Sequence, residues 1–69
     1  MKNRIEYVGF IYCLDDIEVE FIVDGAKKNL YIQSKGIEEI LDFMNCQEND
    51  NEEILLDNYF ETYKQEIFA

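Results

Sequence analysis

The pattern of apolar and polar residues predicts three strands followed by two helices. Residues 5–14 are apolar or aromatic at both odd and even positions, which is typical of a strand with both faces covered. Residues 17–24 alternate between apolar and mainly acidic side chains, which predicts a strand with one buried face. A shorter strand is predicted over residues 30–34, with Leu30 and Ile32 on the core side. Because only turns separate the three strands, they should form an antiparallel meander.

Two turns fix how these strands are expected to pair. Asp15-Asp16 supplies the first turn, and Asp24-Gly25 opens a second one that residues 27–29 continue. A hairpin centred on the first turn would bury eight side chains in four cross-strand pairs. These pairs are Leu14 with Ile17, Tyr12 with Val19, Phe10 with Phe21, and Val8 with Val23.

The opposite face of the sheet should carry an apolar patch made of Tyr7, Ile11, Ile22 and Tyr31. An exposed apolar patch of this kind marks an interaction surface when nothing else in the chain covers it. Either the last helix or a second copy of the chain could cover the patch. It is therefore a candidate face for a homodimer.

After the strands, the apolar period changes from two residues to that of a helix. A first helix is predicted over residues 36–46, with Ser34 as its N-cap. A second is predicted over residues 51–67, because Asp50 and Glu53 have the spacing of a capping box. Its apolar face carries Leu56, Tyr59, Phe60, Tyr63 and Ile67. The fold class is therefore α+β, a three-stranded antiparallel β-meander followed by two α-helices packed on the sheet, in a single small domain.

The composition argues against several classes of function. The chain has no His, one Ser and one Thr among 69 residues, so a hydroxyl nucleophile with a histidine base cannot be assembled. Cys13 and Cys46 fall short of the four ligands of a structural zinc site, and we expect them to be free thiols rather than a disulfide. No apolar run is long enough to span a membrane, and the first residues do not resemble a secretory signal. We expect a cytoplasmic protein that is not an enzyme and needs no cofactor or metal.

The negative charge is concentrated in the second half of the chain. Residues 37–69 hold ten Asp and Glu against one Lys, whereas residues 1–36 hold six acids and five bases. A one-signed surface on so small a protein favours a binding function and opposes direct contact with DNA or RNA. The partner expected for such a surface is a basic protein.

The acids of the second predicted helix have a regular spacing. Glu53, Asp57 and Glu61 recur every four residues, so they should lie on one helix face about 6 Å apart per step. The next position in this series is Gln65, which cannot neutralise them. Phosphates along one nucleic-acid strand are spaced similarly, at roughly 6–7 Å. The row of carboxylates predicted to bind a partner is completed from the preceding loop and comprises Glu48, Asp50, Glu52, Glu53, Asp57 and Glu61.

Two other interpretations of these carboxylates stay open. A solvated helix face would also be acidic, and Glu52 and Glu53 suit the first turn of a helix without any partner. A calcium loop counted from Asp50 would place Glu61 at its twelfth position. Leu55 then stands at the position where the sharp turn of such a loop needs glycine.

The order of elements and the charge resemble those of the small acidic anti-CRISPR proteins of phages. The likeness extends from Val19 to Phe60, and the chain departs from that pattern because it lacks an N-terminal helix. It is carried by the hairpin with Asp24-Gly25, the helix around Ile37 to Met44, the acidic run Glu48-Asn49-Asp50-Asn51-Glu52-Glu53, and Tyr59-Phe60. The resemblance implies a compact α+β domain that inhibits RNA-guided nucleases by placing carboxylates in the basic groove meant for DNA.

These observations lead to two hypotheses about function. The first is an inhibitor, such as a phage-encoded anti-CRISPR or other anti-defence protein acting inside a bacterial host cell. It would mimic nucleic-acid charge and occupy the basic nucleic-acid groove of a protein partner such as a CRISPR effector. The second is a small homodimeric or adaptor module that binds through the apolar sheet face.

Overall fold

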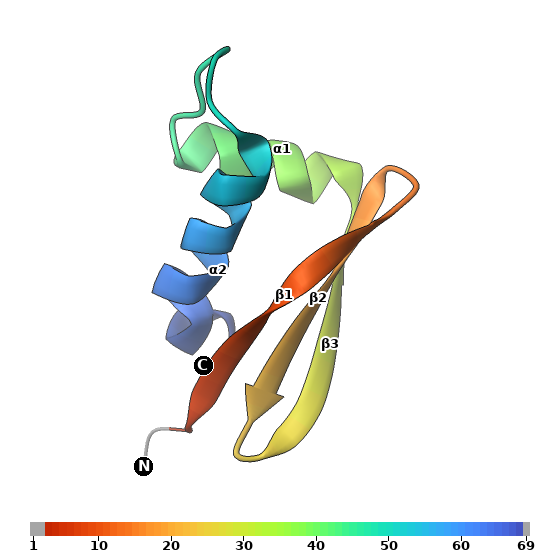
Figure 1. Ribbon diagram of the computed structural model, residues 1–69, viewed down its shortest axis with the longest axis vertical. Coiled ribbons are helices and arrows are strands. Elements are labelled where there is room, and N and C mark those ends of the chain that lie inside the picture. Colours follow the sequence, from red (N-terminus) through yellow and green to blue (C-terminus); the bar gives the residue numbers. More distant parts are fainter. Residues whose placement is uncertain (1–2, 69) are drawn as a thin grey trace.

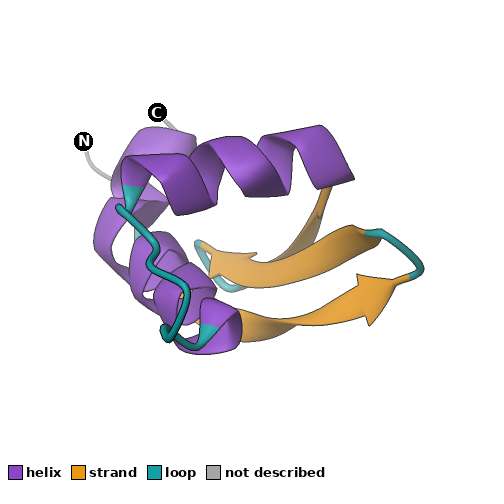
Figure 2. Ribbon diagram, turned by 90° about the horizontal axis from the view of Figure 1, so that it is seen from above, coloured by secondary structure: helices purple, strands orange, loops and turns teal. Residues whose placement is uncertain are grey.

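The computed structural model describes residues 3–68 and confirms the predicted α+β architecture (Figure 1). Three antiparallel strands form one sheet in the order β1-β2-β3, and two helices follow. Figure 2 shows both helices gathered along one side of the strands. The elements are β1 (Ile5–Cys13), β2 (Asp16–Val23), β3 (Ala26–Ile32), α1 (Ser34–Phe43) and α2 (Glu52–Ile67).

A β-bulge in β1 decides which side chains of this strand face the helices. Gly9 pairs with Glu20 and Tyr7 pairs with Phe21, so Val8 is an extra residue without a partner in β2. The bulge turns Tyr7 towards the core and leaves Val8 52% exposed. The predicted register is also wrong. Tyr12 lies opposite Ile17 and Phe10 opposite Val19, two residues away from the expected pairing.

The register differs because the first turn consists of Leu14 and Asp15. Asp16 already belongs to β2, and its Oδ1 accepts a hydrogen bond of 3.2 Å from the backbone N–H of Ser34. Leu14 adopts a φ of 61° and is 99% exposed, so its predicted place on the buried face is wrong.

The second turn is tighter than predicted. Asp24 and Gly25 have φ values of 52° and 83°, the positive pair that a type I′ hairpin turn requires. β3 consequently begins at Ala26, and residues 27–29 pair with β2 instead of extending the turn. Leu30 and Ile32 pack against the core, as predicted.

Backbone groups at the helix ends find partners that differ from those predicted. Ser34 is the first residue of α1 rather than its N-cap, and the side chain of Asp16 takes over the capping role. At α2 the cap is Asn51, whose Oδ1 accepts hydrogen bonds from the N–H groups of Glu53 (2.9 Å) and Ile54 (3.2 Å). The predicted cap, Asp50, instead accepts a hydrogen bond from Gln47 within the loop.

The core lies between the sheet and the two helices. Phe60 is at its centre, fully buried, with its ring centroid 5.7 Å from Tyr7, 6.2 Å from Phe10 and 6.2 Å from Phe21. The packing of Leu56, Tyr59, Phe60 and Ile67 confirms these members of the predicted apolar face of α2, whereas Tyr63 packs against Phe43 and Tyr59 outside the core cluster. The buried cluster consists of Ile5, Ile17, Val19, Phe21, Ile37, Leu56 and Phe60.

Neither of the helices described over residues 3–68 combines the length and the apolar character needed to cross a lipid bilayer.

Candidate partner-binding surface

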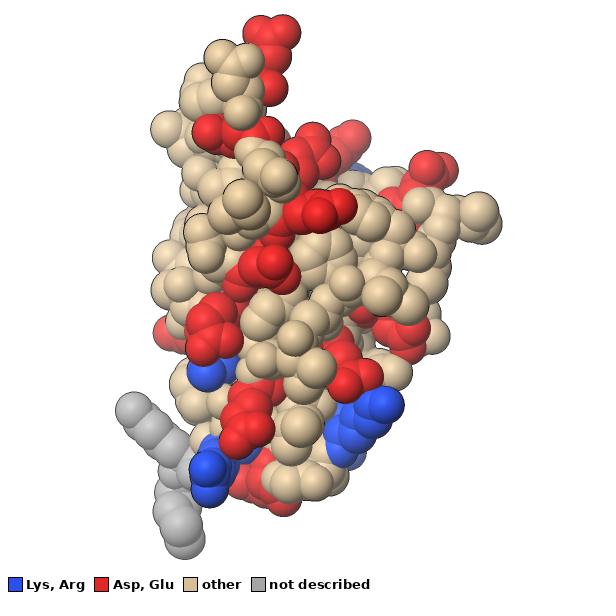
Figure 3. Space-filling view, viewed as in Figure 1, with Lys and Arg blue, Asp and Glu red and all other residues tan. Residues whose placement is uncertain are grey.

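All six carboxylates predicted to bind a partner are exposed on the molecule. Glu48 and Asp50 lie in the loop between the helices, Glu52 and Glu53 in the first turn of α2, and the other two further along that helix. Acidic side chains form a nearly continuous band down the face drawn in Figure 3. The basic side chains visible on this face lie mainly in its lower half.

Asp57 is held in place by a residue of β1. The Tyr7 hydroxyl donates a hydrogen bond to Asp57 Oδ1, and the Tyr7 ring packs 5.6 Å from Phe21 and 5.7 Å from Phe60. Partial burial, this hydrogen bond and the charges of Asp57 and Glu61 raise the pKa of Tyr7 well above its ordinary value. The hydrogen bond fixes the Asp57 carboxylate against the sheet.

Two hollows border the acidic surface, and Tyr12 contributes to both. The first has a volume of about 320 Å³ and lies between the bulge of β1 and α2. Its walls are Val8, Gly9, Phe10, Tyr12, Glu53 and Asp57. The second, of about 350 Å³, is lined by Tyr12, Leu14, Asp15, Ser34, Ile37, Glu38, Leu41 and Glu52. Burial and the nearby charges of Glu53 and Glu52 raise the pKa of Tyr12.

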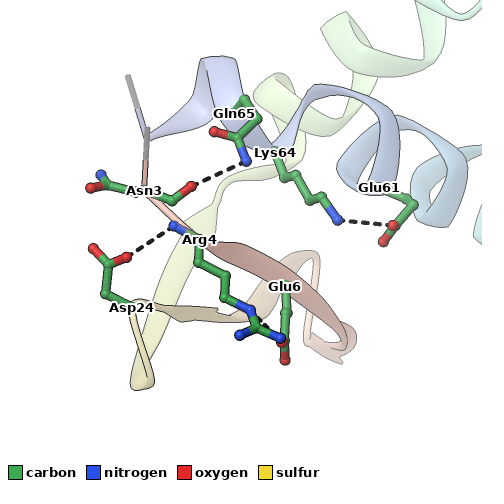
Figure 4. Close-up of polar contacts among 7 residues, drawn as sticks. All are labelled: Asn3, Arg4, Glu6, Asp24, Glu61, Lys64 and Gln65. Atoms are coloured by element: carbon green, nitrogen blue, oxygen red, sulfur yellow. Dashed lines mark hydrogen bonds and ion pairs between the residues drawn. The ribbon is translucent and has the colours of Figure 1, made fainter. Parts of the chain in front are cut away.

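The acidic stripe is partly neutralised at its end, contrary to the prediction from its four-residue series. Lys64 Nζ lies 3.0 Å from Glu61 Oε1, three residues along the same helix (Figure 4). Lys64 is off the line of the stripe, which is why the series ending at Gln65 did not include it. Gln65 instead donates from Nε2 to the backbone oxygen of Asn3 at 3.4 Å.

Other bases pair with acids outside the predicted set. Arg4 lies 3.6 Å from Glu6, and its backbone N–H donates to Asp24 (Figure 4). Lys27 lies 3.3 Å from Glu20 on the sheet. Within residues 3–68, Glu61 is therefore the only member of the predicted set with a cationic partner.

The predicted apolar patch on the other face of the sheet exists in altered form. Tyr7 does not belong to it, because the bulge turns this side chain towards Phe60. Ile11 and Tyr31 are 61% and 67% exposed, and Val8 lines a hollow with Ile11 on this face. α1 and α2 pack on the opposite face, so the last helix does not cover this patch.

The residues needed for a calcium loop do not converge. Asp50 is bonded to Gln47, and α2 starts at Glu52, so Glu61 lies about 14 Å further along the helix axis. No group of three or more possible ligands comes together in the part of the chain that is described. Cys13 and Cys46 are both free thiols.

Sequence reasoning missed three residues of this surface. The sequence pattern predicts Tyr7 on the wrong face, Tyr12 only in the core, and Leu14 opposite Ile17. A glycine within a strand is a known sign of a bulge, and Gly9 is the one signal that could have corrected the placement of Tyr7.

Comparison of the chain with protein-family models, curated proteins and solved structures gives no match.

Proposed function

We propose that this protein is an inhibitor that imitates the charge of a nucleic-acid strand and occupies the basic groove of a nucleic-acid-binding protein. A CRISPR effector is the partner that the resemblance to anti-CRISPR proteins suggests. The observation that carries the proposal is the row of six exposed carboxylates, of which only Glu61 has a cationic partner within residues 3–68.

The geometry of α2 supports this proposal. Glu53, Asp57 and Glu61 follow one another along a single helix, at steps of about 6 Å along its axis. That step is comparable to the roughly 6–7 Å between successive phosphates of a nucleic-acid strand. Because the helix fixes the backbone spacing and Tyr7 holds Asp57, the side chain of Asp57 has less conformational freedom to lose on binding.

The overall charge supports the same partner chemistry. A net charge of −10 on 69 residues attracts Lys- and Arg-rich surfaces from a distance and repels nucleic acid. Salt screens such attraction beyond about 8 Å at physiological ionic strength. Complex formation should therefore be fast at low salt and should weaken as salt is added.

Capture from a bacterial lysate, followed by elution with a salt gradient and mass spectrometry, identifies the partner. Inhibition is then measured as the loss of DNA binding by the purified partner. The test variant replaces Glu53→Gln, Asp57→Asn and Glu61→Gln. It removes three charges, while the amide oxygen at position 57 can still accept the Tyr7 hydrogen bond.

A matched control removes the same number of charges from exposed acids outside the predicted set, through Glu39→Gln, Asp42→Asn and Glu66→Gln. The proposal expects the first variant to lose inhibition and the control to keep it. Equal loss in both variants would show that only the net charge matters. Full inhibition by the first variant would show that the acidic row is a solvated helix face.

A second candidate function is supported by the uncovered sheet face. Ile11 and Tyr31 remain mainly exposed although the chain has two helices that could have covered them. This favours a homodimer or adaptor that binds through the patch, although Glu18 and Glu20 on the same face oppose association of two identical copies. Light scattering separates the two candidates, because a dimer has twice the monomer mass and Ile11→Ser would return it to monomer.

A further inference from the structure

Leu14 at the tip of the β1–β2 hairpin combines two unfavourable features. Its side chain is 99% exposed, the highest value among the exposed large apolar residues. Its backbone has a φ of 61°, in the left-handed region that residues with a Cβ rarely adopt. Neither burial nor backbone preference therefore explains a leucine at this position.

The other hairpin of the same sheet shows what turn geometry alone would select. Asp24-Gly25 occupies its two turn positions, a pair that tolerates positive φ. In the first turn only Leu14 has positive φ, and a two-residue turn of that kind normally has glycine there. Strain retained at an exposed position is characteristic of functional sites.

The surroundings of Leu14 connect it to the acidic surface. It lines the hollow of about 350 Å³ together with Tyr12, Asp15, Glu38 and Glu52. Tyr12 is 49% exposed and also borders the hollow that holds Glu53 and Asp57. An apolar tip and a tyrosine ring thus lie next to the proposed binding carboxylates and are flanked by further acids.

We propose that Leu14 is the apolar anchor of the interface with the basic partner, and this inference rests on the proposed function. The leucine enters an apolar pocket on that protein, and Lys or Arg side chains at the pocket rim face Glu38, Glu52 and Asp15. Charge brings the two proteins together, whereas a buried apolar anchor slows their dissociation. The proposed interface therefore combines an apolar anchor with charged contacts.

The first test separates an anchor from a structural residue by measuring stability. Asn tolerates positive φ better than Leu does, so Leu14→Asn should leave the urea midpoint unchanged or raise it. Leu14→Met keeps an apolar side chain and serves as the conservative variant. A clear fall in the midpoint of Leu14→Asn would assign Leu14 a structural role and overturn the proposal.

The second test measures binding with a defined probe. Two short peptides carry equal numbers of lysines, alternating with leucine in one and with serine in the other, and each is titrated into ¹⁵N-labelled protein at low salt. Both should shift the amide signals of Glu53 and Asp57. The leucine peptide alone should shift Leu14 and Asp15, and it should bind about tenfold more tightly.

Leu14→Asn should abolish the preference for the leucine peptide, Leu14→Met should keep it, and the control Tyr31→Gln on the open sheet face should not change it. An equal preference in Leu14→Asn, or shifts confined to Ile11 and Tyr31, would overturn the anchor. If neither peptide shifts Glu53 and Asp57, the charge mimicry fails, and the anchor fails with it. If both peptides shift Glu53 and Asp57 but the leucine peptide binds no more tightly, only the anchor fails.

Discussion

Deleting Val8 should leave the fold intact, although the deletion removes a residue from the middle of a strand. Val8 is the extra residue of the bulge, and the partners of Tyr7 and Gly9 are already consecutive in β2. Without Val8, each remaining residue of β1 keeps its partner. Tyr7 also stays on the core side, because the strand then alternates regularly.

The expected cost of this deletion is small. Val8 is 52% exposed, so its loss removes about half of one valine burial, roughly 1 kcal/mol. Deleting Glu20 from β2 is the contrasting control, because it shifts the alternation of side chains in one half of the central strand to the opposite face of the sheet. Val19 and Phe21 have no exposed surface. One of them would then face solvent, together with the other core-facing residue of the same half of the strand. Exposing two such side chains costs about 3–6 kcal/mol. The total free energy of unfolding of a chain of this length is about 3–10 kcal/mol.

Urea unfolding followed by far-ultraviolet circular dichroism measures both variants. The Val8 deletion should unfold cooperatively with an unchanged m-value and a free energy of unfolding lower by about 1 kcal/mol. The Glu20 deletion should lower the free energy of unfolding by about 3–6 kcal/mol and therefore unfold at a much lower urea concentration. If the Val8 deletion is as unstable as the Glu20 deletion, the bulge does not set the register and the placement of Tyr7 beside Asp57 is wrong.

Two further changes test the contacts that position the acidic helix. Tyr7→Phe removes the hydrogen bond to Asp57 and should lower the free energy of unfolding by about 1 kcal/mol at neutral pH. Because the folded state raises the pKa of Tyr7 above its unfolded value of about 10, this contribution is fully present below pH 10 and is lost as the pH rises through the folded pKa. Urea midpoints of wild type and variant should thus converge above pH 10, and a constant difference would contradict this. Asn51→Ala should lower the free energy of unfolding by about 1 kcal/mol because Asn51 caps α2, whereas Asn49→Ala in the same loop should be nearly neutral. Equal urea midpoints for the two variants would show that Asn51 does not stabilise α2 as its cap.

The parts of the fold that were predicted correctly have one clear period each. Val19 and Phe21 alternate with acids in β2, and Leu56 and Phe60 recur at helical spacing in α2, so their burial followed from the sequence. β1 is apolar at both parities and gives no preference between registers. Gly9 is its only local sign of a bulge, and it does not show which neighbouring residue is the extra one.

The candidate site also has some features that the sequence predicts and others that it does not. The exposure of Glu53 and Asp57 followed from helical spacing. The contact between Tyr7 and Asp57 joins residues 50 positions apart and depends on the bulge, so local patterns could not predict it. The pairing of Glu61 with Lys64 is different, because neighbours three residues apart on a helix face each other and the sequence already contained this signal.

In the proposed function, the acidic surface takes the place of nucleic acid on a basic protein. The most direct test measures the dissociation constant for the captured partner from low to high salt, with and without a competing DNA duplex. Charge mimicry predicts that affinity falls steeply with salt, that the variant with Glu53→Gln, Asp57→Asn and Glu61→Gln shows a shallower dependence, and that DNA and the protein exclude each other. An affinity independent of salt, or simultaneous binding of DNA and the protein, would contradict it.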